Sequence, residues 1–158
     1  MPLGLCLAAI VVILDQITKA LVLSFLEPYQ VVDWVPFLSW VLVFNTGISF
    51  GFFAGETAIL RWVLIGLALT ISVCLMVWLY KEKRPVFSGA IGLILGGAIG
   101  NTVDRVFRHA VVDFIDLHVG YWHWPAFNVA DAAITTGVVL YVFTSLRDHY
   151  RSSKLSSK

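Results

Sequence analysis

The sequence predicts a mainly α-helical membrane protein with four transmembrane helices, because it is too apolar for a soluble domain and contains four long apolar runs. Of its 158 residues, 59% are hydrophobic and only 13% are Asp, Glu, Lys or Arg, and the mean hydropathy is +0.85. Soluble domains carry such charged side chains at about a quarter of their positions. We therefore expect most of the protein surface to face lipid rather than water.

Four apolar segments are each long enough to cross the hydrocarbon core of a bilayer, which takes about 20 residues of helix. The predicted spans are about 5–25, 59–80, 86–103 and 129–146, within one membrane domain over 1–146 that is followed by a polar tail, 147–158. The third span carries a stripe of small residues, Gly92, Gly96 and Gly100, on which another helix could lie close.

The segment between the first two spans differs from them in composition. Residues 27–58 combine aromatic and β-branched side chains with two prolines and several glycines. This composition is typical of short strands and turns rather than of a fifth span. A second long connection, 104–128, is also aromatic and contains Pro125.

The positive charges predict how the helices are oriented. Lys81, Lys83 and Arg84 join spans two and three, and four more Lys or Arg residues follow span four. The positive-inside rule places these segments and both termini in the cytoplasm, so that the two longer connections face outward. The net charge of +1 provides no basic face for nucleic acid. Cys6 and Cys74 have no metal-ligand spacing and are interpreted as buried thiols.

Polar residues are costly in lipid, at roughly 2.5–3.5 kcal/mol for a charge at the centre of a span, and are usually functional there. They gather in four clusters, which lie at 15–19, at 44–51, at 100–105 with 111–116, and at 127–131. Asp15 and Lys19 are four residues apart on one helical face and could neutralise each other. A structural ion pair and a catalytic role both fit this pair.

Asp131 also fits two roles. It follows Asn128 by three residues at the start of the fourth span, which is the spacing of a capping box. The helix dipole would in addition keep its carboxylate ionised beside a second carboxyl group. Two adjacent carboxyls share one proton, so one can act as a base toward water while the other acts as an acid toward a peptide carbonyl. The pattern alone leaves both roles open.

In order and spacing these clusters resemble the motifs of the lipoprotein signal peptidase family, also called signal peptidase II. Any one motif would be weak, but five in order are specific. The resemblance covers essentially the whole chain apart from the tail. Its motifs are Asp15-Gln16 with Lys19, Phe44-Asn45-Thr46-Gly47 continuing to Phe50, Gly96-Gly97-Ala98-Ile99-Gly100-Asn101 running into Asp104-Arg105, Val111-Val112-Asp113-Phe114, and Phe127-Asn128-Val129-Ala130-Asp131.

The resemblance implies an aspartyl endopeptidase of the bacterial inner membrane that removes signal peptides from diacylglyceryl-modified prolipoproteins at the outer face. It implies Asp113 and Asp131 as the catalytic pair and a small outer β-cradle over 27–58. It implies no cofactor or metal, and no partner beyond the substrate and membrane lipid. The implied substrate-binding or supporting residues are Asn45, Asn101, Arg105, Asn128, Asp15, Lys19 and Asp104.

Two nearby carboxylates need separate interpretation. Asp104 is a second candidate partner for Asp131, but Arg105 and Arg108 follow it at ion-pair spacing. This spacing favours Asp113 as the catalytic partner. Asp116 is interpreted as a loop residue.

Three other functions compete with this interpretation. The run 47–51 fits the Gly-x-Ser-x-Gly pattern of serine hydrolases, but that pattern needs an α/β sheet. A zinc protease would need His-Glu-x-x-His, whereas His109, His118 and His123 are interpreted as interfacial or hydrogen-bonded loop residues. A transporter would need polar residues through the full depth of the bilayer, and here they crowd the outer half.

Overall fold

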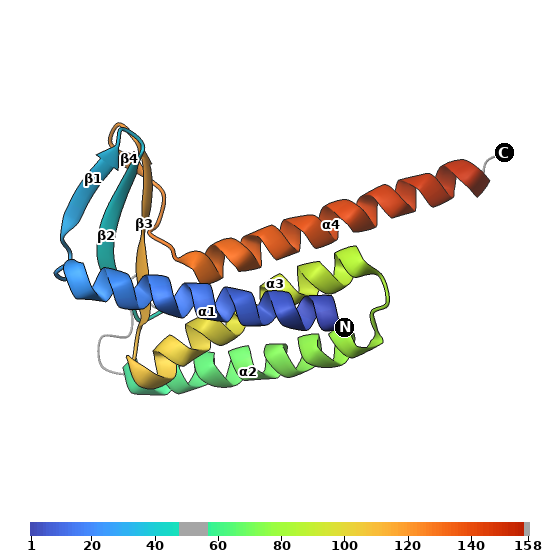
Figure 1. Cartoon of the computed structure of the whole chain (residues 1–158), viewed down its shortest axis with the longest axis horizontal. Coiled ribbons are helices and arrows are strands. Elements are labelled where there is room, and N and C mark those ends of the chain that lie inside the picture. The colour runs from blue at the N-terminus through green and yellow to red at the C-terminus, as the bar shows by residue number, and fades with distance from the viewer. Residues whose placement is uncertain (48–56, 157–158) are drawn as a thin grey trace.

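The computed structural model describes residues 1–47 and 57–156, which form four long helices and one small antiparallel sheet (Figure 1). All four helices are long and apolar enough to cross a membrane, which confirms the predicted fold class. In chain order the elements are α1 (Pro2–Phe25), β1 (Val31–Val35), β2 (Leu38–Asn45), α2 (Thr57–Lys81), α3 (Pro85–Phe107), β3 (Val111–Val119), β4 (Trp122–His123) and α4 (Val129–Ser156).

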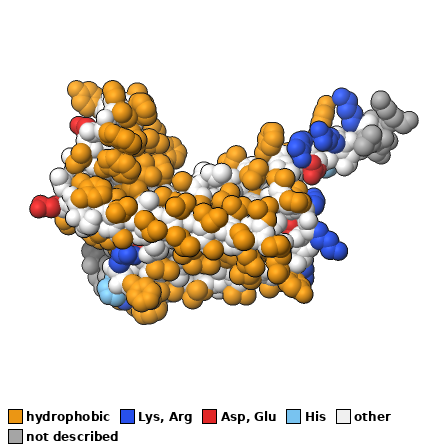
Figure 2. All heavy atoms as spheres, in the orientation of Figure 1, with side chains coloured by type: hydrophobic (Ala, Val, Ile, Leu, Met, Phe, Trp, Pro, Cys, Tyr) orange, Lys and Arg blue, Asp and Glu red, His pale blue; other side chains and the backbone are white. Residues whose placement is uncertain are grey.

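The helices run between two distinct ends of the molecule. Both termini and the α2–α3 connection lie at one end, and the sheet stands at the other (Figure 1). Hydrophobic side chains cover the visible flank of the helices, and many of the Lys and Arg side chains gather near the end with the termini (Figure 2). Helix α4 continues to Ser156, past the predicted end of its span at 146, because residues 147–156 contain neither proline nor glycine.

Helix α3 is the central helix of the bundle. In its most apolar stretch 67% of the residues are buried, against 17–28% in the other three helices. The predicted glycine stripe explains this position: a Cβ atom at Gly96 would lie 2.7 Å from the carbonyl oxygen of Ala8 on α1. A Cβ atom at Gly97 would overlap the carbonyl oxygen of Ala130 on α4. Small residues therefore let both neighbouring helices touch the α3 backbone.

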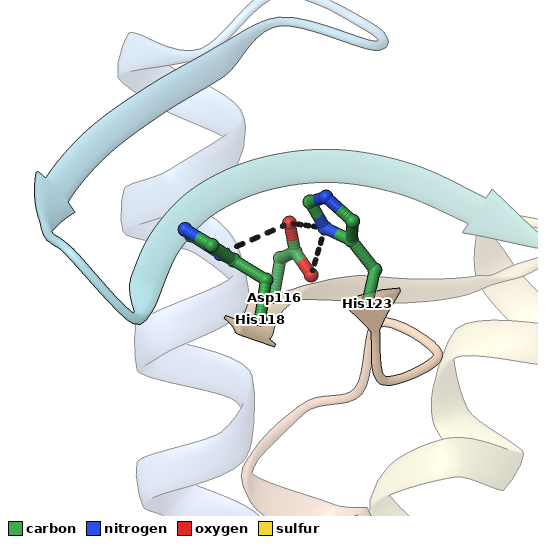
Figure 3. A group of neighbouring side chains, drawn as sticks. All are labelled: Asp116, His118 and His123. Atoms are coloured by element: carbon green, nitrogen blue, oxygen red, sulfur yellow. Dashed lines mark hydrogen bonds and ion pairs between the residues drawn. The ribbon is translucent and has the colours of Figure 1, made fainter. Parts of the chain in front are cut away.

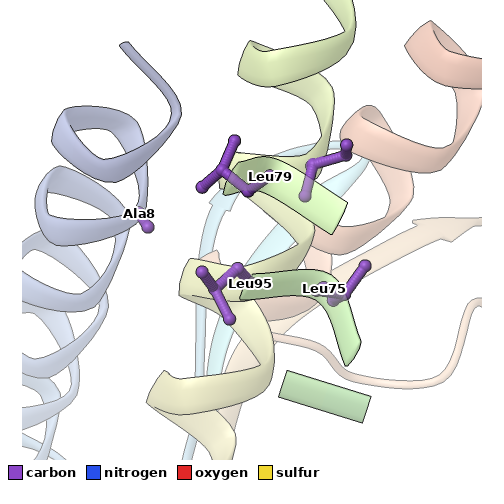
Figure 4. Packing of buried hydrophobic residues seen from close by; sticks show 5 residues of the cluster. Ala8, Leu75, Leu79 and Leu95 are labelled. Carbon is purple, nitrogen blue, oxygen red and sulfur yellow. The ribbon is translucent and has the colours of Figure 1, made fainter. Parts of the chain in front are cut away.

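Where α1, α2 and α3 meet, apolar side chains interlock (Figure 4). Leu79 and Ile91 are fully buried there, and Leu95 is nearly so. In lipid such contacts stabilise the bundle by close packing rather than by removing apolar surface from water. This cluster holds α3 in place at the end of the bundle away from the sheet.

The sheet has the strand order β1-β2-β3-β4 with antiparallel neighbours throughout. In the described part of the predicted β-cradle over 27–58 the strands are β1 and β2, and the second outer connection supplies β3 and β4. The interpretation of Asp116 as a loop residue is wrong, because it lies in β3 and is buried. Strand β3 pairs with β2, which is distant in the sequence. The composition of a single segment does not predict such a long-range pairing.

Two further expectations concerned the cysteines and the Gly-x-Ser-x-Gly pattern. The prediction that Cys6 and Cys74 are buried is wrong, because both are exposed on the surfaces of their helices. A thiol behaves as a small apolar group, so it can face lipid at little cost. The Gly-x-Ser-x-Gly pattern lies outside the described residues apart from Gly47, as does Phe50 of the second motif.

Candidate active site

Asp113 lies near the start of β3, and its carboxylate is held by two amide groups. The β2–β3 pairing sets Asn45 opposite Val111 and Val43 opposite Asp113, so Asn45 shares a sheet face with Asp113. The Nδ2 of Asn45 donates a hydrogen bond of 3.0 Å to one carboxylate oxygen. The Nδ2 of Asn128 donates a bond of 2.7 Å to the other oxygen. Both oxygens of Asp113 are therefore fixed by donors from outside β3.

Asp131 lies in the first turn of α4, where it completes the predicted capping box. Its backbone N–H donates to Oδ1 of Asn128 at 2.9 Å, and its own Oδ2 accepts from the backbone N–H of Asn128 at 3.2 Å. Its other oxygen accepts a 2.8 Å hydrogen bond from Nδ2 of Asn101 on α3. The carboxylate thus caps its helix and also lies in a polar cluster with side chains of other elements.

Asn128 links the two predicted catalytic aspartates. It is fully buried, and its Nδ2 donates to the carboxylate of Asp113 while its Oδ1 accepts from the backbone N–H of Asp131. The same Nδ2 also lies 3.2 Å from Oδ1 of Asn101. One amide side chain therefore sets the position of Asp113 relative to the start of α4.

The surroundings of Asp113 favour its protonated form. The pKa of the Asp113 carboxyl is raised to about 6, chiefly by burial and also by the negative charge of Asp131. The hydrogen bond from Asn45 acts in the opposite direction, because it stabilises the ionised form. A carboxyl group with such a pKa can hold a proton close to neutral pH and release it again.

A buried ionic cluster lies next to the two aspartates. The Lys19 ammonium is 2.8 Å from Asp15 and 2.8 Å from Asp104, and it donates to Oδ1 of Asn101 at 3.1 Å. Both carboxylates and the ammonium are fully buried. The second oxygen of Asp15 accepts a 3.0 Å bond from the backbone N–H of Ala130. The predicted Asp15–Lys19 pair is therefore present, and it connects α1 with α3 and with the start of α4.

The contacts of Asp104 differ from those of Asp113. Asp104 is paired with Lys19 and with Arg108, at 2.5 Å, and it accepts the backbone N–H of Val112 at 3.1 Å. Gln16 adds a further hydrogen bond to it at 3.2 Å. The predicted ion pair with Arg108 is therefore present. Gln16 has no predicted role of its own, although it stands between Asp15 and Lys19 in the first motif.

Arg105 faces the two predicted catalytic aspartates from α3. It is attracted electrostatically by Asp131 and Asp113. Its NH1 group lies 3.4 Å from the backbone oxygen of Asn101, and its buried Nε has no hydrogen-bond partner among the described residues. A guanidinium group in this state has donors left for a further ligand.

Cavities open beside both aspartates. A cavity of about 240 Å³ borders Asp113, and its other lining residues are Val43, Phe44, Asn45, Thr46, Pro125 and Ala126. A second cavity of about 370 Å³ borders Asp131, and its other lining residues are Leu117, Trp124, Phe127, Ala132, Thr135 and Thr136. The site is therefore accessible from two sides of the sheet–helix junction.

Known proteins share this sequence and this fold. Residues 7–147 match the family described as Signal peptidase (SPase) II. The lipoprotein signal peptidase of Polynucleobacter necessarius is 44% identical over 153 residues, which cover 96% of this chain and 94% of that protein. The lipoprotein signal peptidase of Burkholderia thailandensis is 41% identical over 143 residues, which cover 89% of this chain and 86% of that protein.

The solved structures give the same result. A bacterial membrane enzyme determined by the in meso method at 1.9 Å resolution superposes with a TM-score of 0.82 at 31% identity. The match covers 94% of this chain and 95% of that one. Since the family match spans most of the chain and the relatives match over nearly their full length, this protein belongs to the signal peptidase II family.

Proposed function

We propose that the protein is an aspartyl endopeptidase that removes signal peptides from diacylglyceryl-modified bacterial prolipoproteins. The observation that carries the aspartyl mechanism is the buried Asn128, whose side-chain Nδ2 donates to the Asp113 carboxylate and whose backbone N–H donates to the Asp131 carboxylate. The names of the relatives support the substrate class, since both are called lipoprotein signal peptidase. A shared site for two carboxyl groups is the arrangement that activates water in aspartyl proteases.

In the proposed reaction the two aspartates hold one proton between them. Asp131, at a helix N-terminus that favours its ionised form, takes a proton from water as the water oxygen attacks the scissile carbonyl carbon. Asp113, whose pKa is raised to about 6, donates its proton to the carbonyl oxygen. The tetrahedral intermediate then collapses: the C–N bond breaks, one hydroxyl proton returns to Asp113 as the carbonyl re-forms, and the leaving nitrogen takes up a proton from Asp131. The products are a carboxyl group on the signal peptide and a free amine on the lipid-modified cysteine.

Other residues of the site serve as supports in this proposal. Asn101 orients Asp131, and Lys19 fixes the orientation of the Asn101 amide by donating to its oxygen. Asp15 ties the start of α4 to α1 through the backbone of Ala130. Arg105 is placed to donate to a backbone carbonyl of the substrate, because it is attracted to both aspartates and its Nε lacks a hydrogen-bond partner among the described residues.

The proposed lipid-binding surface follows α4 from the site into the membrane. The cavity beside Asp131 shares Thr135 and Thr136 with a third cavity of about 400 Å³, which is also lined by Val139, Leu140 and Phe143. Apolar walls of this kind suit acyl chains and the apolar part of a signal peptide. We place the protein in the bacterial inner membrane with both termini in the cytoplasm and the sheet outside.

A transporter is the main rival function. It would need polar groups through the depth of the membrane. Among the described residues, the buried charged side chains are Asp15, Lys19, Asp104, Asp113 and Asp116, and they lie on the sheet side of the bundle. This one-sided distribution favours a site at one membrane surface over a path across the bilayer.

The test is cleavage of a diacylglyceryl-modified prolipoprotein by the purified protein in detergent, followed on a gel. We expect cleavage of the lipidated substrate and none of the same substrate without its lipid. We also expect cleavage to resist phenylmethylsulfonyl fluoride, since no serine nucleophile takes part. Inhibition by this reagent would contradict the aspartyl mechanism. No cleavage of a confirmed lipidated substrate would contradict the peptidase function itself.

A further inference from the structure

Asp116, His118 and His123 form a cluster at the β3–β4 hairpin that the proposed peptide cleavage does not use (Figure 3). Asp116 and His118 are two residues apart on β3 and so share one face of the strand. The β3–β4 pairing sets His123 directly opposite His118. Asp113 is three residues before Asp116 and therefore faces the other side of β3.

The three side chains approach one another closely. The Nδ1 of His123 lies 2.8 and 3.1 Å from the two carboxylate oxygens of Asp116. The Nδ1 of His118 lies 3.8 Å from Oδ2 of Asp116. One potential ligand atom from each of the three residues lies within 4.8 Å of the other two. Around a tetrahedral Zn²⁺, with bonds of about 2.0–2.2 Å, ligand atoms are about 3.4 Å apart. Small side-chain rotations would therefore bring all three donors onto one ion.

The carboxylate of Asp116 requires a positive partner. Its side chain is only 10% exposed, and among the described residues its ion-pair partners are the two histidines alone. Asp104, whose side chain is fully buried, has both a lysine and an arginine. A buried carboxylate without a cation is costly, and a bound metal ion would offset its charge.

The donor atoms are also available to a metal. The Nδ1 of His118 is buried and has no hydrogen-bond partner among the described residues. The side chain of His123 is 54% exposed, which gives an ion a route from water. Two imidazoles with one carboxylate suit Zn²⁺ and related transition ions, whereas Ca²⁺ and Mg²⁺ prefer oxygen ligands alone.

We propose that Asp116, His118 and His123 bind one divalent transition ion of the Zn²⁺ class, with water completing its coordination. The ion would clip the β3–β4 hairpin, whose turn uses Gly120 at a φ of 60°. This inference departs from the sequence-based expectation of no metal. In a loop, two histidines five residues apart are not expected to lie side by side. The pairing of β3 with β4 brings His118 and His123 onto the same face of the hairpin.

The direct test is calorimetric titration of the full-length protein with ZnCl₂. The protein is prepared in detergent without a polyhistidine tag, and endogenous metal is removed with a chelator that is then exchanged away. We expect one Zn²⁺ per chain and at least about tenfold weaker binding in both His118→Gln and His123→Gln. The matched control is His149→Gln, an exposed histidine on α4, which should bind as the wild type does.

A second readout keeps the proposal testable if a histidine variant folds poorly. Zn²⁺ should raise the Tm of the wild type and leave that of a correctly folded Asp116→Asn variant unchanged. Asp113→Asn should bind Zn²⁺ as the wild type does, which separates this site from the proposed peptidase. A wild type without saturable Zn²⁺ binding, or histidine variants that bind as tightly as the wild type, would overturn the proposal.

Discussion

Lys19 is a fully buried side chain that makes three polar contacts. Its ammonium contacts Asp15, Asp104 and Asn101, which lie on two helices. Breaking a buried ion pair by removing one partner costs about 3–5 kcal/mol. We therefore expect Lys19→Met to lower the Tm markedly. It should also abolish cleavage, because the Asn101 amide loses the bond that orients it toward Asp131.

Lys83→Met is the matched control for this prediction. Lys83 is exposed in the short α2–α3 connection, far from the sheet. Its replacement should leave both the Tm and the cleavage rate unchanged. An unaltered Tm in Lys19→Met would show that the buried ion cluster does not hold these helices together.

Asp113 gives the reaction its pH dependence. Its pKa is raised to about 6, mainly by burial, and the dyad works with one proton. The rate should therefore fall as the pH rises through about 6, when this proton is lost, and fall again in acid, when both carboxyls are protonated. The measurement is kcat/KM for the lipidated substrate as a function of pH, and a flat profile would argue against the dyad.

The Asn45→Ala variant tests the cause of this pKa. Asn45 donates to the ionised carboxylate of Asp113 and so lowers its pKa. Without that bond the pKa should rise further, and the alkaline limb of the profile should move to higher pH. A limb that stays in place would mean that another group sets it.

At the residue scale, the sequence motifs singled out residues that lie close together in the structure, but they did not predict the hydrogen bonds between them. Asp113, Asp131 and Asn128 were predicted from motifs, and the capping box at Asn128 was predicted from spacing alone. The contact of the Asn128 amide with Asp113 was not predicted, because it joins a strand to a helix that begins many residues later. Side-chain contacts of this kind depend on tertiary packing.

Among the secondary-structure elements, helix α4 is positioned by its contact with α3. A Cβ atom at Gly97 would overlap the carbonyl oxygen of Ala130, one residue before Asp131. We expect Gly97→Ala to push the start of α4 away from α3, and so to lower both the Tm and the cleavage rate. Gly66→Ala on α2 is the control, since a Cβ there meets no atom within 4 Å and alanine favours helix. Equal behaviour of the two variants would contradict the proposed packing.

The helices were predictable at this scale because each is a long apolar run that lipid selects by length. The strands were only half predictable. Composition indicated the first two, whereas β3 is a buried strand whose partner β2 lies on the far side of two helices in the sequence. Its aspartates at 113 and 116 also obscure the run of apolar residues that would otherwise indicate a strand.

For the whole molecule, the proposed orientation predicts which positions are reached from outside the cell membrane. Tyr121 is fully exposed at the tip of the β3–β4 hairpin, and Ser153 is exposed near the end of α4. In a variant whose two native cysteines are replaced by alanine, Tyr121→Cys should react with a membrane-impermeant maleimide in spheroplasts. Ser153→Cys should react only after the membrane is broken. The reverse pattern of labelling would show that the topology is opposite to the one proposed.

The central claim, that Asp131 belongs to a catalytic pair, is tested most directly by cleavage of a lipidated prolipoprotein with Asp131→Asn. The matched control is Asp33→Asn, which changes an exposed carboxylate on β1 and keeps an oxygen to accept from Ser39. We expect a folded Asp131→Asn variant to show no cleavage and Asp33→Asn to cleave at the wild-type rate. Wild-type cleavage by Asp131→Asn would reduce Asp131 to a helix cap and contradict the mechanism.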